Sequence, residues 1–95
     1  MKAHVYITET GERVRERDGL VEVSLSSEAQ AALGKILHFQ APRNGVWVEK
    51  GDRLFVVEGT LTAAEFYASA SGRVKSLAST MSQAHDWFVW IKTSS

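Results

Sequence analysis

The chain is predicted to fold as a small all-β barrel or sandwich that carries one short α-helix. Many short runs of apolar or alternating residues predict strands, and frequent Gly-containing turns separate them. One stretch, between Ser26 and Gly34, carries helix start and stop signals instead. The 95 residues are expected to form a single domain over residues 1–95, which is large enough for one small core.

The composition excludes several classes of protein. There is no cysteine, which rules out disulfides, zinc–thiolate sites and thiol nucleophiles. The 11 acidic and 11 Lys or Arg residues include no long block of one sign, so neither a nucleic-acid surface nor an anionic-membrane surface is indicated. No apolar run approaches the roughly 20 residues that span a membrane. The N-terminus lacks the apolar core of a signal peptide, so we expect a cytoplasmic protein.

The N-terminal quarter is predicted to form strands. Residues 4–8 are rich in β-branched and aromatic side chains and indicate a first strand. Residues 13–17 hold one apolar residue in five, so we expect an exposed edge strand there. Asp18-Gly19 is a strong signal for a two-residue hairpin turn. In residues 20–25 the apolar side chains at odd positions predict a half-buried strand with those residues facing the core.

Alternate arginines along residues 13–17 allow two interpretations. They could form a basic patch for a partner, or they could lie on the solvated face of a strand. Acidic neighbours dilute their charge, so we favour the solvated face. The residues concerned are Arg13, Arg15 and Arg17, with Glu12, Glu16 and Asp18 beside them.

A short helix is predicted from Ser26-Ser27-Glu28 onward. Either Ser26 or Ser27 can act as its N-cap, since both are followed by residues suited to a first turn. Gly34 stands where such a helix ends. A strand over residues 35–40 is expected next, and strict alternation places Ile36 and His38 on one face and Leu37 and Phe39 on the other.

The central feature of the sequence is a hairpin. Residues 54–57 are all apolar, which predicts a strand buried on both faces. Residues 58–62 are predicted to turn, with Gly59 supplying the backbone freedom that a turn needs. Residues 63–67 lead back as the second strand, and Leu61 is expected at the tip.

Shorter strands are predicted on either side of this hairpin. Residues 46–48 precede it between two turns, and residues 73–77 follow the Ser71-Gly72 turn. Residues 79–86 show no clear period. Residues 87–91 are expected to close the barrel, and Trp87 and Trp90 cannot both face inward on a regular strand.

The hairpin segment GDRLFVVEGTLTAAEFYASASGRV resembles the lipoyl-attachment region of the glycine-cleavage H-protein family, a branch of the biotinyl/lipoyl carrier domains. That family has a Gly-Asp turn, an apolar strand, Glu-Ser-x-Lys, a second strand and Ser-Gly. Residues 26–42 and 86–92 are similar to further segments of the family. The matching positions in the hairpin are Gly51-Asp52, Val57-Glu58, Tyr67 and Ser71-Gly72.

The resemblance implies a barrel-sandwich hybrid with one short helix and a lipoyl group on a lysine at the hairpin tip. The acceptor lysine of the family falls on Leu61, whose alkyl side chain cannot form an amide with a cofactor carboxyl group. Lys50 and Lys75 are the lysines flanking the hairpin in the sequence, and neither is expected to carry the arm. The segment over residues 73–86 is shorter than in the family, and Thr10-Gly11-Glu12 replaces its His-x-Trp.

We therefore predict an H-protein-like domain that is not lipoylated and acts as a non-catalytic protein-binding or regulatory module. The alternative is a working carrier of an aminomethyl or acyl group, with lipoate as its cofactor. Leu61 could insert into a partner, could be a relic of decay, or could fold back on its own hairpin. The candidate contacts with a protein partner of unknown identity are Glu58, Gly59, Thr60, Leu61 and Thr62.

No catalytic or metal site is expected. His4, His38 and His85 lie far apart in the sequence, and none has ligand spacing with another. Glu58 and Glu65 flank the central turn but form no recognisable acid/base pair. The sequence thus predicts no enzyme activity, no resident cofactor, and neither nucleic acid nor membrane as a partner.

Overall fold

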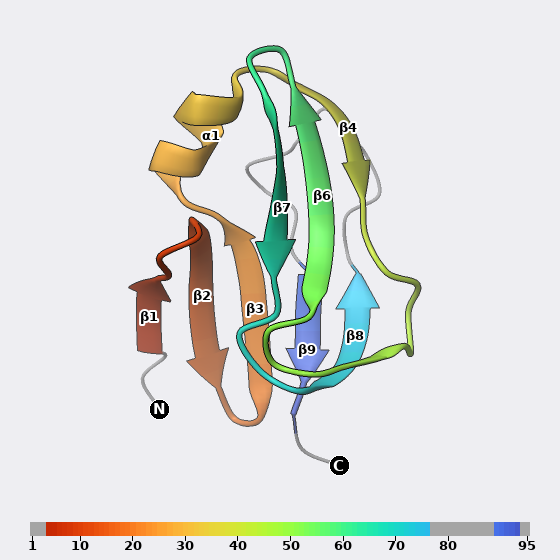
Figure 1. Ribbon diagram of the computed structural model, residues 1–95. Helices are drawn as coiled ribbons and strands as arrows, with labels where there is room; N and C mark the ends of the chain where they lie inside the picture. The colour runs from red at the N-terminus through yellow and green to blue at the C-terminus, as the bar shows by residue number, and fades with distance from the viewer. Residues whose placement is uncertain (1–3, 77–88, 94–95) are drawn as a thin grey trace.

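Nine strands and one helix make up the computed structural model, which describes residues 4–76 and 89–93 (Figure 1). The helix α1 spans Ser27–Leu33. The strands are β1 (His4–Ile7), β2 (Glu12–Arg17), β3 (Leu20–Leu25), β4 (Ile36–Gln40), β5 (Trp47–Val48), β6 (Arg53–Gly59), β7 (Ala63–Tyr67), β8 (Gly72–Ser76) and β9 (Val89–Lys92).

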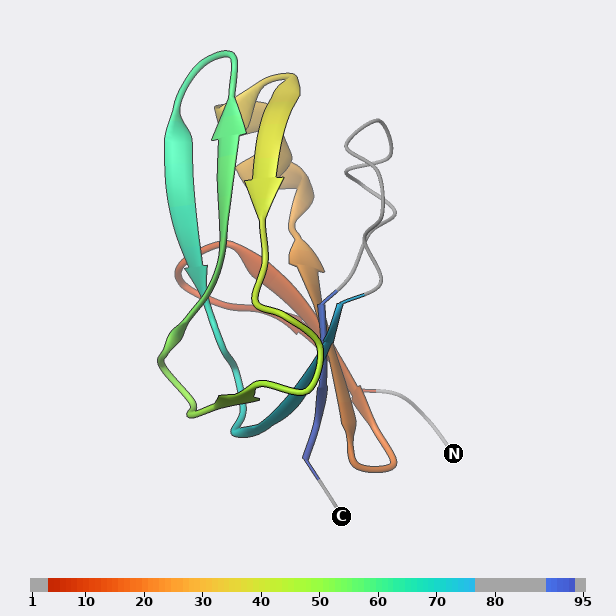
Figure 2. The ribbon, with the colours of Figure 1, turned by 90° about the vertical axis from the view of Figure 1, so that its right-hand side faces the viewer.

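The strands form two open antiparallel sheets. One sheet has six strands in the order β1-β2-β3-β9-β8-β5, and the other has three in the order β4-β6-β7. Figure 2 shows the smaller sheet on one side of the molecule, facing the larger one. The predicted barrel-sandwich hybrid is confirmed in class, but β9 does not close a barrel. It pairs with β3 on one side and with β8 on the other, and so links the N-terminal strands β1–β3 to β8 and β5 within one sheet.

The core lies between the sheets. Phe55 and Phe66, from neighbouring strands of the smaller sheet, stack with ring centroids 5.2 Å apart. The predicted burial of residues 54–57 is confirmed for three of the four, while Val56 is half-buried. The other buried apolar side chains are Val14, Val21, Val23, Leu25, Leu33, Val48, Leu54, Val57, Ala68, Val74, Val89 and Ile91.

The prediction that residues 13–17 form an edge strand is wrong. They belong to β2, which pairs with β1 on one side and with β3 on the other. Its single apolar residue, Val14, is fully buried. The edge strand on this side of the sheet is instead β1, because the turn after β1 folds it back onto β2.

The Asp18-Gly19 hairpin turn is confirmed. Both residues have positive φ, 49° and 76°, as a two-residue turn matching the strand twist requires. The odd-numbered residues of β3 face the core as predicted. The same strand is not half-buried, however, because Glu22 and Ser24 on its other face are 2% and 4% exposed.

The helix begins with one of the two serines that were predicted as its N-cap. Ser26 is the N-cap, and its Oγ accepts a hydrogen bond from the Ala29 amide at 3.1 Å. Ser27 is the first residue of α1 and is exposed. Gly34 ends the helix with φ 79°, as expected.

Strict alternation in β4 is a wrong prediction. The pairing of β4 with β6 shifts register between Ile36 and His38, which marks a bulge. As a result Ile36 and Phe39, predicted on opposite faces, both pack against the core. Leu37 and His38 are both exposed.

Two stretches considered in the sequence lie partly or wholly outside the described residues. Residues 79–86, which show no clear period, are outside them, and so is Trp87 of the strand predicted over residues 87–91. Trp90 lies in β9 and is half-buried between fully buried Val89 and Ile91. Within the described ranges, the helix that is present is too short to cross a membrane.

Candidate functional site

The hairpin tip is a short turn between β6 and β7. The Gly59 amide donates to the Thr62 carbonyl at 2.9 Å and closes the turn. Thr60, Leu61 and Thr62 form its exposed end. Figure 1 shows the turn between β6 and β7 beside the connection from α1 to β4. Leu61 is 71% exposed, more than any other large apolar side chain of the described residues. The alternative in which the Leu61 side chain folds back onto its own hairpin is therefore wrong.

The tip is held to the end of α1 by three hydrogen bonds. The Leu61 amide donates to the Leu33 carbonyl at 3.0 Å, and the Thr60 amide donates to the Lys35 carbonyl at 2.9 Å. In return, the Lys35 amide donates to Thr60 Oγ1 at 3.1 Å. These bonds satisfy main-chain groups at the helix C-terminus and restrain the hairpin end.

Gly59 is required for a reason other than the one predicted. It lies within β6, is buried, and is not among the glycines with positive φ. A Cβ at this position would lie 2.1 Å from the Leu33 carbonyl oxygen. The glycine therefore permits a close approach between β6 and the end of α1 instead of supplying turn flexibility.

Lys35 is an amine beside the tip that sequence reasoning missed. It is 26 positions before Leu61, outside the segment bounded by Lys50 and Lys75. The main-chain bonds to Thr60 bring it to the tip, and its side chain is exposed. No spacing signal links residues so far apart, since their proximity depends on α1 packing over β6.

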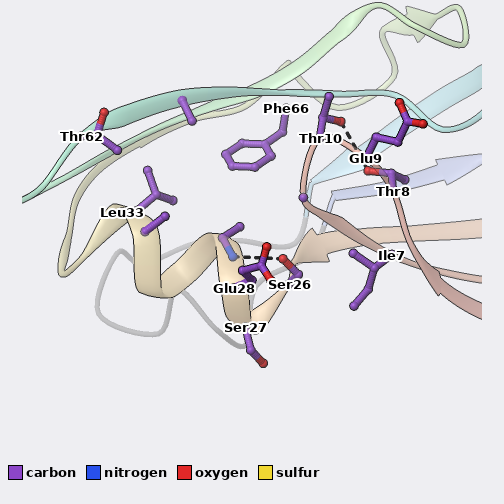
Figure 3. A pocket seen from close by; sticks show the side chains of 14 residues that line it. Ile7, Thr8, Glu9, Thr10, Ser26, Ser27, Glu28, Leu33, Thr62 and Phe66 are labelled. Carbon is purple, nitrogen blue, oxygen red and sulfur yellow. Dashed lines mark hydrogen bonds between the residues drawn. The ribbon is translucent and has the colours of Figure 1, made fainter.

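A groove of about 520 Å³ opens next to the tip (Figure 3). Its walls are one side of α1, the face of β7 that carries Phe66, and the turn between β1 and β2. Thr62 lines the end of the groove nearest the tip, and Ile7 lies among the residues of the β1–β2 side. Most of the lining surface is apolar, so the groove suits an apolar or amphipathic chain.

Glu12 ties the β1–β2 turn to β7 and so shapes one wall of the groove. Glu12 is 1% exposed, and its carboxylate accepts a hydrogen bond from the Tyr67 amide at 2.9 Å. The Thr10 hydroxyl donates to it at 2.5 Å, and the Thr8 hydroxyl also donates. A buried carboxylate needs such donors to offset its lost hydration. In the sequence Glu12 stands out only as an acidic neighbour of the arginines, so this role was not predicted.

The remaining charges near the hairpin are on the surface. Glu58 is exposed at the end of β6, and Glu65 pairs with Arg53 at 3.2 Å. The Tyr67 hydroxyl donates to Glu65 at 3.1 Å, and this hydrogen bond is the main cause that raises the pKa of Tyr67. Of the five predicted contact residues, Gly59 is buried and the other four are exposed.

The described residues bring no metal-ligating cluster together. His4 and His38 lie in different sheets, and His85 lies outside the described residues. Over residues 4–76 and 89–93, no three His, Cys, Asp or Glu side chains could hold one metal ion. The tip itself presents an alkyl and two hydroxyl groups, which do not fit the attachment of a carboxylic acid cofactor through an amide.

Three comparisons relate the chain to known proteins. The family model described as glycine cleavage H-protein matches residues 5–88. The chain is 38% identical over 63 residues to the glycine cleavage system H protein of Polynucleobacter necessarius, covering 66% of this chain and 42% of that protein. It is 38% identical over 73 residues to that of Paraburkholderia phymatum, covering 76% and 58%. The chain thus spans about half the length of the curated relatives it matches.

A solved structure has the same fold. The crystal structure of a glycine cleavage system H protein from Mycobacterium marinum superposes with a TM-score of 0.80 at 24% identity. The match covers 99% of this chain and 87% of that one. At this identity the likeness concerns the arrangement of the strands and the helix.

Proposed function

The chain belongs to the glycine cleavage H-protein family, and from this premise we propose that it carries no lipoyl group and acts as a protein-binding or regulatory module. The family consists of carrier proteins without catalytic activity of their own, so the chain is not an enzyme. The proposal treats residues 1–95 as one domain that works in the cytoplasm.

Leu61 carries this proposal. The family's acceptor position, as the motif match assigns it, holds an alkyl side chain that has no nitrogen to acylate. The hairpin over residues 53–67 contains no lysine at all. An amide link between residue 61 and a lipoyl group is therefore chemically excluded, because leucine has no amine.

The exposed tip has properties that suit binding. Fully burying a leucine side chain contributes about 1.5–3 kcal/mol, which matters in a small interface. The hydrogen bonds from the tip to Leu33 and Lys35 already fix the main chain, so little conformational entropy remains to be lost on association. We propose that Glu58, Thr60, Leu61 and Thr62 contact a protein partner with an apolar pocket.

The intact mass of the protein purified from its own host tests the first part. We expect the mass of the unmodified chain. A mass increase equal to one lipoyl group would contradict the proposal directly.

A capture experiment from host lysate tests the second part. Leu61→Asp is expected to lose partners that the wild type retains, because a carboxylate at the tip would have to be desolvated. The matched control is Val46→Asp, which changes an apolar residue that is 39% exposed in the β4–β5 connection. Equal capture by wild type and both variants would mean that the tip binds nothing.

A second candidate function is a working carrier whose arm is attached elsewhere. The position of Lys35 favours it, because its main chain is bonded to Thr60 at the tip and the residue is exposed. If the intact mass reveals a lipoyl or other acyl group, Lys35→Arg should abolish it, whereas Lys50→Arg should leave it in place. A modified wild type that keeps its modification in Lys35→Arg would exclude this candidate.

A further inference from the structure

We propose that the outer face of the six-stranded sheet docks an acidic protein surface. The outer face is defined here as the side of that sheet turned away from the core. Its charged side chains come from strands far apart in the sequence. The cations on it are Arg13, Arg15 and Arg17 from β2, Arg73 and Lys75 from β8, and Lys92 from β9.

Strand register places these cations in two rows. Directly paired residues share a face of an antiparallel sheet. One row runs from Arg17 through Leu20, Lys92 and Arg73 to Trp47, and the neighbouring row runs from Val5 through Arg15, Glu22 and Trp90 to Lys75. Because fully buried Val14, Val23, Val74 and Ile91 occupy intervening positions, the charged rows point outward.

Few carboxylates of the described residues lie on this face, and exposed Glu49, just after β5, already accepts a hydrogen bond from Trp47 Nε1 at 2.6 Å. Among the described strand residues of this face, Glu22 is the one carboxylate, and it is already neutralised. Arg15 binds it through Nε at 2.9 Å and through a second guanidinium nitrogen at 2.6 Å. Arg17 lies 3.7 Å from it. Hydrogen bonding to Glu22 also raises the pKa of Arg15.

Three of the cations have no such partner. Arg13, Lys75 and Lys92 are exposed and form no ion pair with a carboxylate of residues 4–76 or 89–93. The whole chain has a formal net charge of zero. Folding has therefore gathered six of its eleven Lys and Arg residues on one face, and most of the acidic residues lie elsewhere.

The composition of the face favours a protein over a nucleic acid. Arginine and tryptophan are enriched at protein interfaces, and Arg73 lies over the exposed Trp47 ring at 5.8 Å from its centroid. Val5 and Ile7 add an apolar margin along β1, at 49% and 62% exposed. Nucleic-acid-binding domains are strongly basic overall, whereas this chain has a pI near 6.8.

The bidentate Arg15–Glu22 pair points to the kind of group that the face recognises. It shows that a guanidinium fork at the centre of the sheet can hold a carboxylate in the geometry typical of Arg and Asp or Glu. Exposed Arg13 would offer the same fork to a carboxylate of a partner, and Lys75 and Lys92 would offer ammonium donors beside it. The surface is separate from the hairpin tip, which belongs to the other sheet (Figure 2).

A labelled peptide of ten glutamates is a suitable probe for binding measured by fluorescence anisotropy. We expect the triple variant Arg13→Gln, Lys75→Gln, Lys92→Gln to weaken binding about tenfold, because three exposed charge pairs that each contribute modestly are lost together. The matched control is Arg43→Gln, Lys50→Gln, Arg53→Gln, which removes three exposed cations outside this face. Binding by the control should stay within about twofold of the wild type.

Two results would overturn the proposal. Equal weakening by both triple variants would mean that the peptide senses net charge and not this face. Tighter binding of a duplex DNA oligonucleotide than of the peptide, lost in the first triple variant, would identify a nucleic-acid surface. The six residues replaced in the two triple variants are all exposed. Both variants should therefore unfold at the melting temperature of the wild type, which would confirm that they fold.

Discussion

Gly59 lies directly against the carbonyl of Leu33, so that a Cβ on Gly59 would come within 2.1 Å of the Leu33 oxygen. This contact joins β6 to the end of α1. The same carbonyl accepts the Leu61 amide, so the approach of the two segments also positions the hairpin tip.

Gly59→Ala is expected to destabilise the fold by about 1–3 kcal/mol, because the methyl group forces β6 away from α1. Faster hydrogen exchange at the Leu61 amide should accompany the loss. The control is Gly45→Ala, which has open space around it but a φ of 87°. It should cost about 1–2 kcal/mol of backbone strain and leave the Leu61 amide protected. Unchanged exchange in Gly59→Ala would show that the contact does not hold the tip.

Ser26→Ala should lower the free energy of unfolding by about 1 kcal/mol, because the Ala29 amide loses its acceptor. Ser27→Ala is the matched control, since Ser27 is exposed and lies inside the first turn. Its effect is expected to stay within about 0.5 kcal/mol. Chemical denaturation of both variants distinguishes the two serines. A larger loss of unfolding free energy in Ser27→Ala than in Ser26→Ala would show that Ser26 is not the cap.

Glu12→Ala is expected to cost about 1–3 kcal/mol, since the Tyr67 amide and two threonine hydroxyls lose the same buried acceptor. Exchange at the Tyr67 amide should become faster, because the β1–β2 turn no longer covers the edge of β7. Glu9→Ala, at an exposed position in the same turn, serves as the control. If the midpoint temperature of thermal unfolding is lowered equally in both variants, the Glu12 hydrogen bonds are not what stabilises this wall of the groove.

Tyr6 gives the fold a dependence on alkaline pH. Burial, together with the 2.7 Å hydrogen bond to Glu16, raises the pKa of Tyr6 to about 12, above its ordinary value near 10. The folded state therefore favours the neutral phenol. Its contribution to stability is complete below pH 10 and is lost as the pH rises through 12.

Unfolding of the wild type and Tyr6→Phe in denaturant at several pH values tests this. We expect the wild type to lose stability relative to Tyr6→Phe between pH 10 and 12, because only its residue 6 can ionise. Tyr67 is present in both proteins, so its own titration cancels in the comparison. Parallel pH profiles for the two proteins would contradict the assignment.

Local signals in the sequence predicted much of the fold. Asp18-Gly19 predicts a turn because both positions need positive φ, and Gly34 predicts a helix end for a similar reason. The apolar run at residues 54–57 and the alternation in residues 20–25 predict strands without knowledge of their partners. The hairpin motif then indicated the family and placed Leu61 at the tip.

Features that depend on pairing between distant segments could not be predicted. Whether β2 is an edge strand depends on where β1 folds, and the bulge in β4 depends on its register with β6. The burial of Glu22 depends on arginines of the neighbouring strand. None of these relationships leaves a periodic trace within a single element.

The sequence by itself determined that residue 61 carries no amine, because the identity of a side chain is independent of packing. Only the tertiary structure decided that Leu61 is exposed, that Lys35 lies beside it, and that six cations share one sheet face. Each of these three facts follows from contacts between residues far apart in the chain. Such contacts depend on how the two sheets and the helix pack together, which local propensity does not specify.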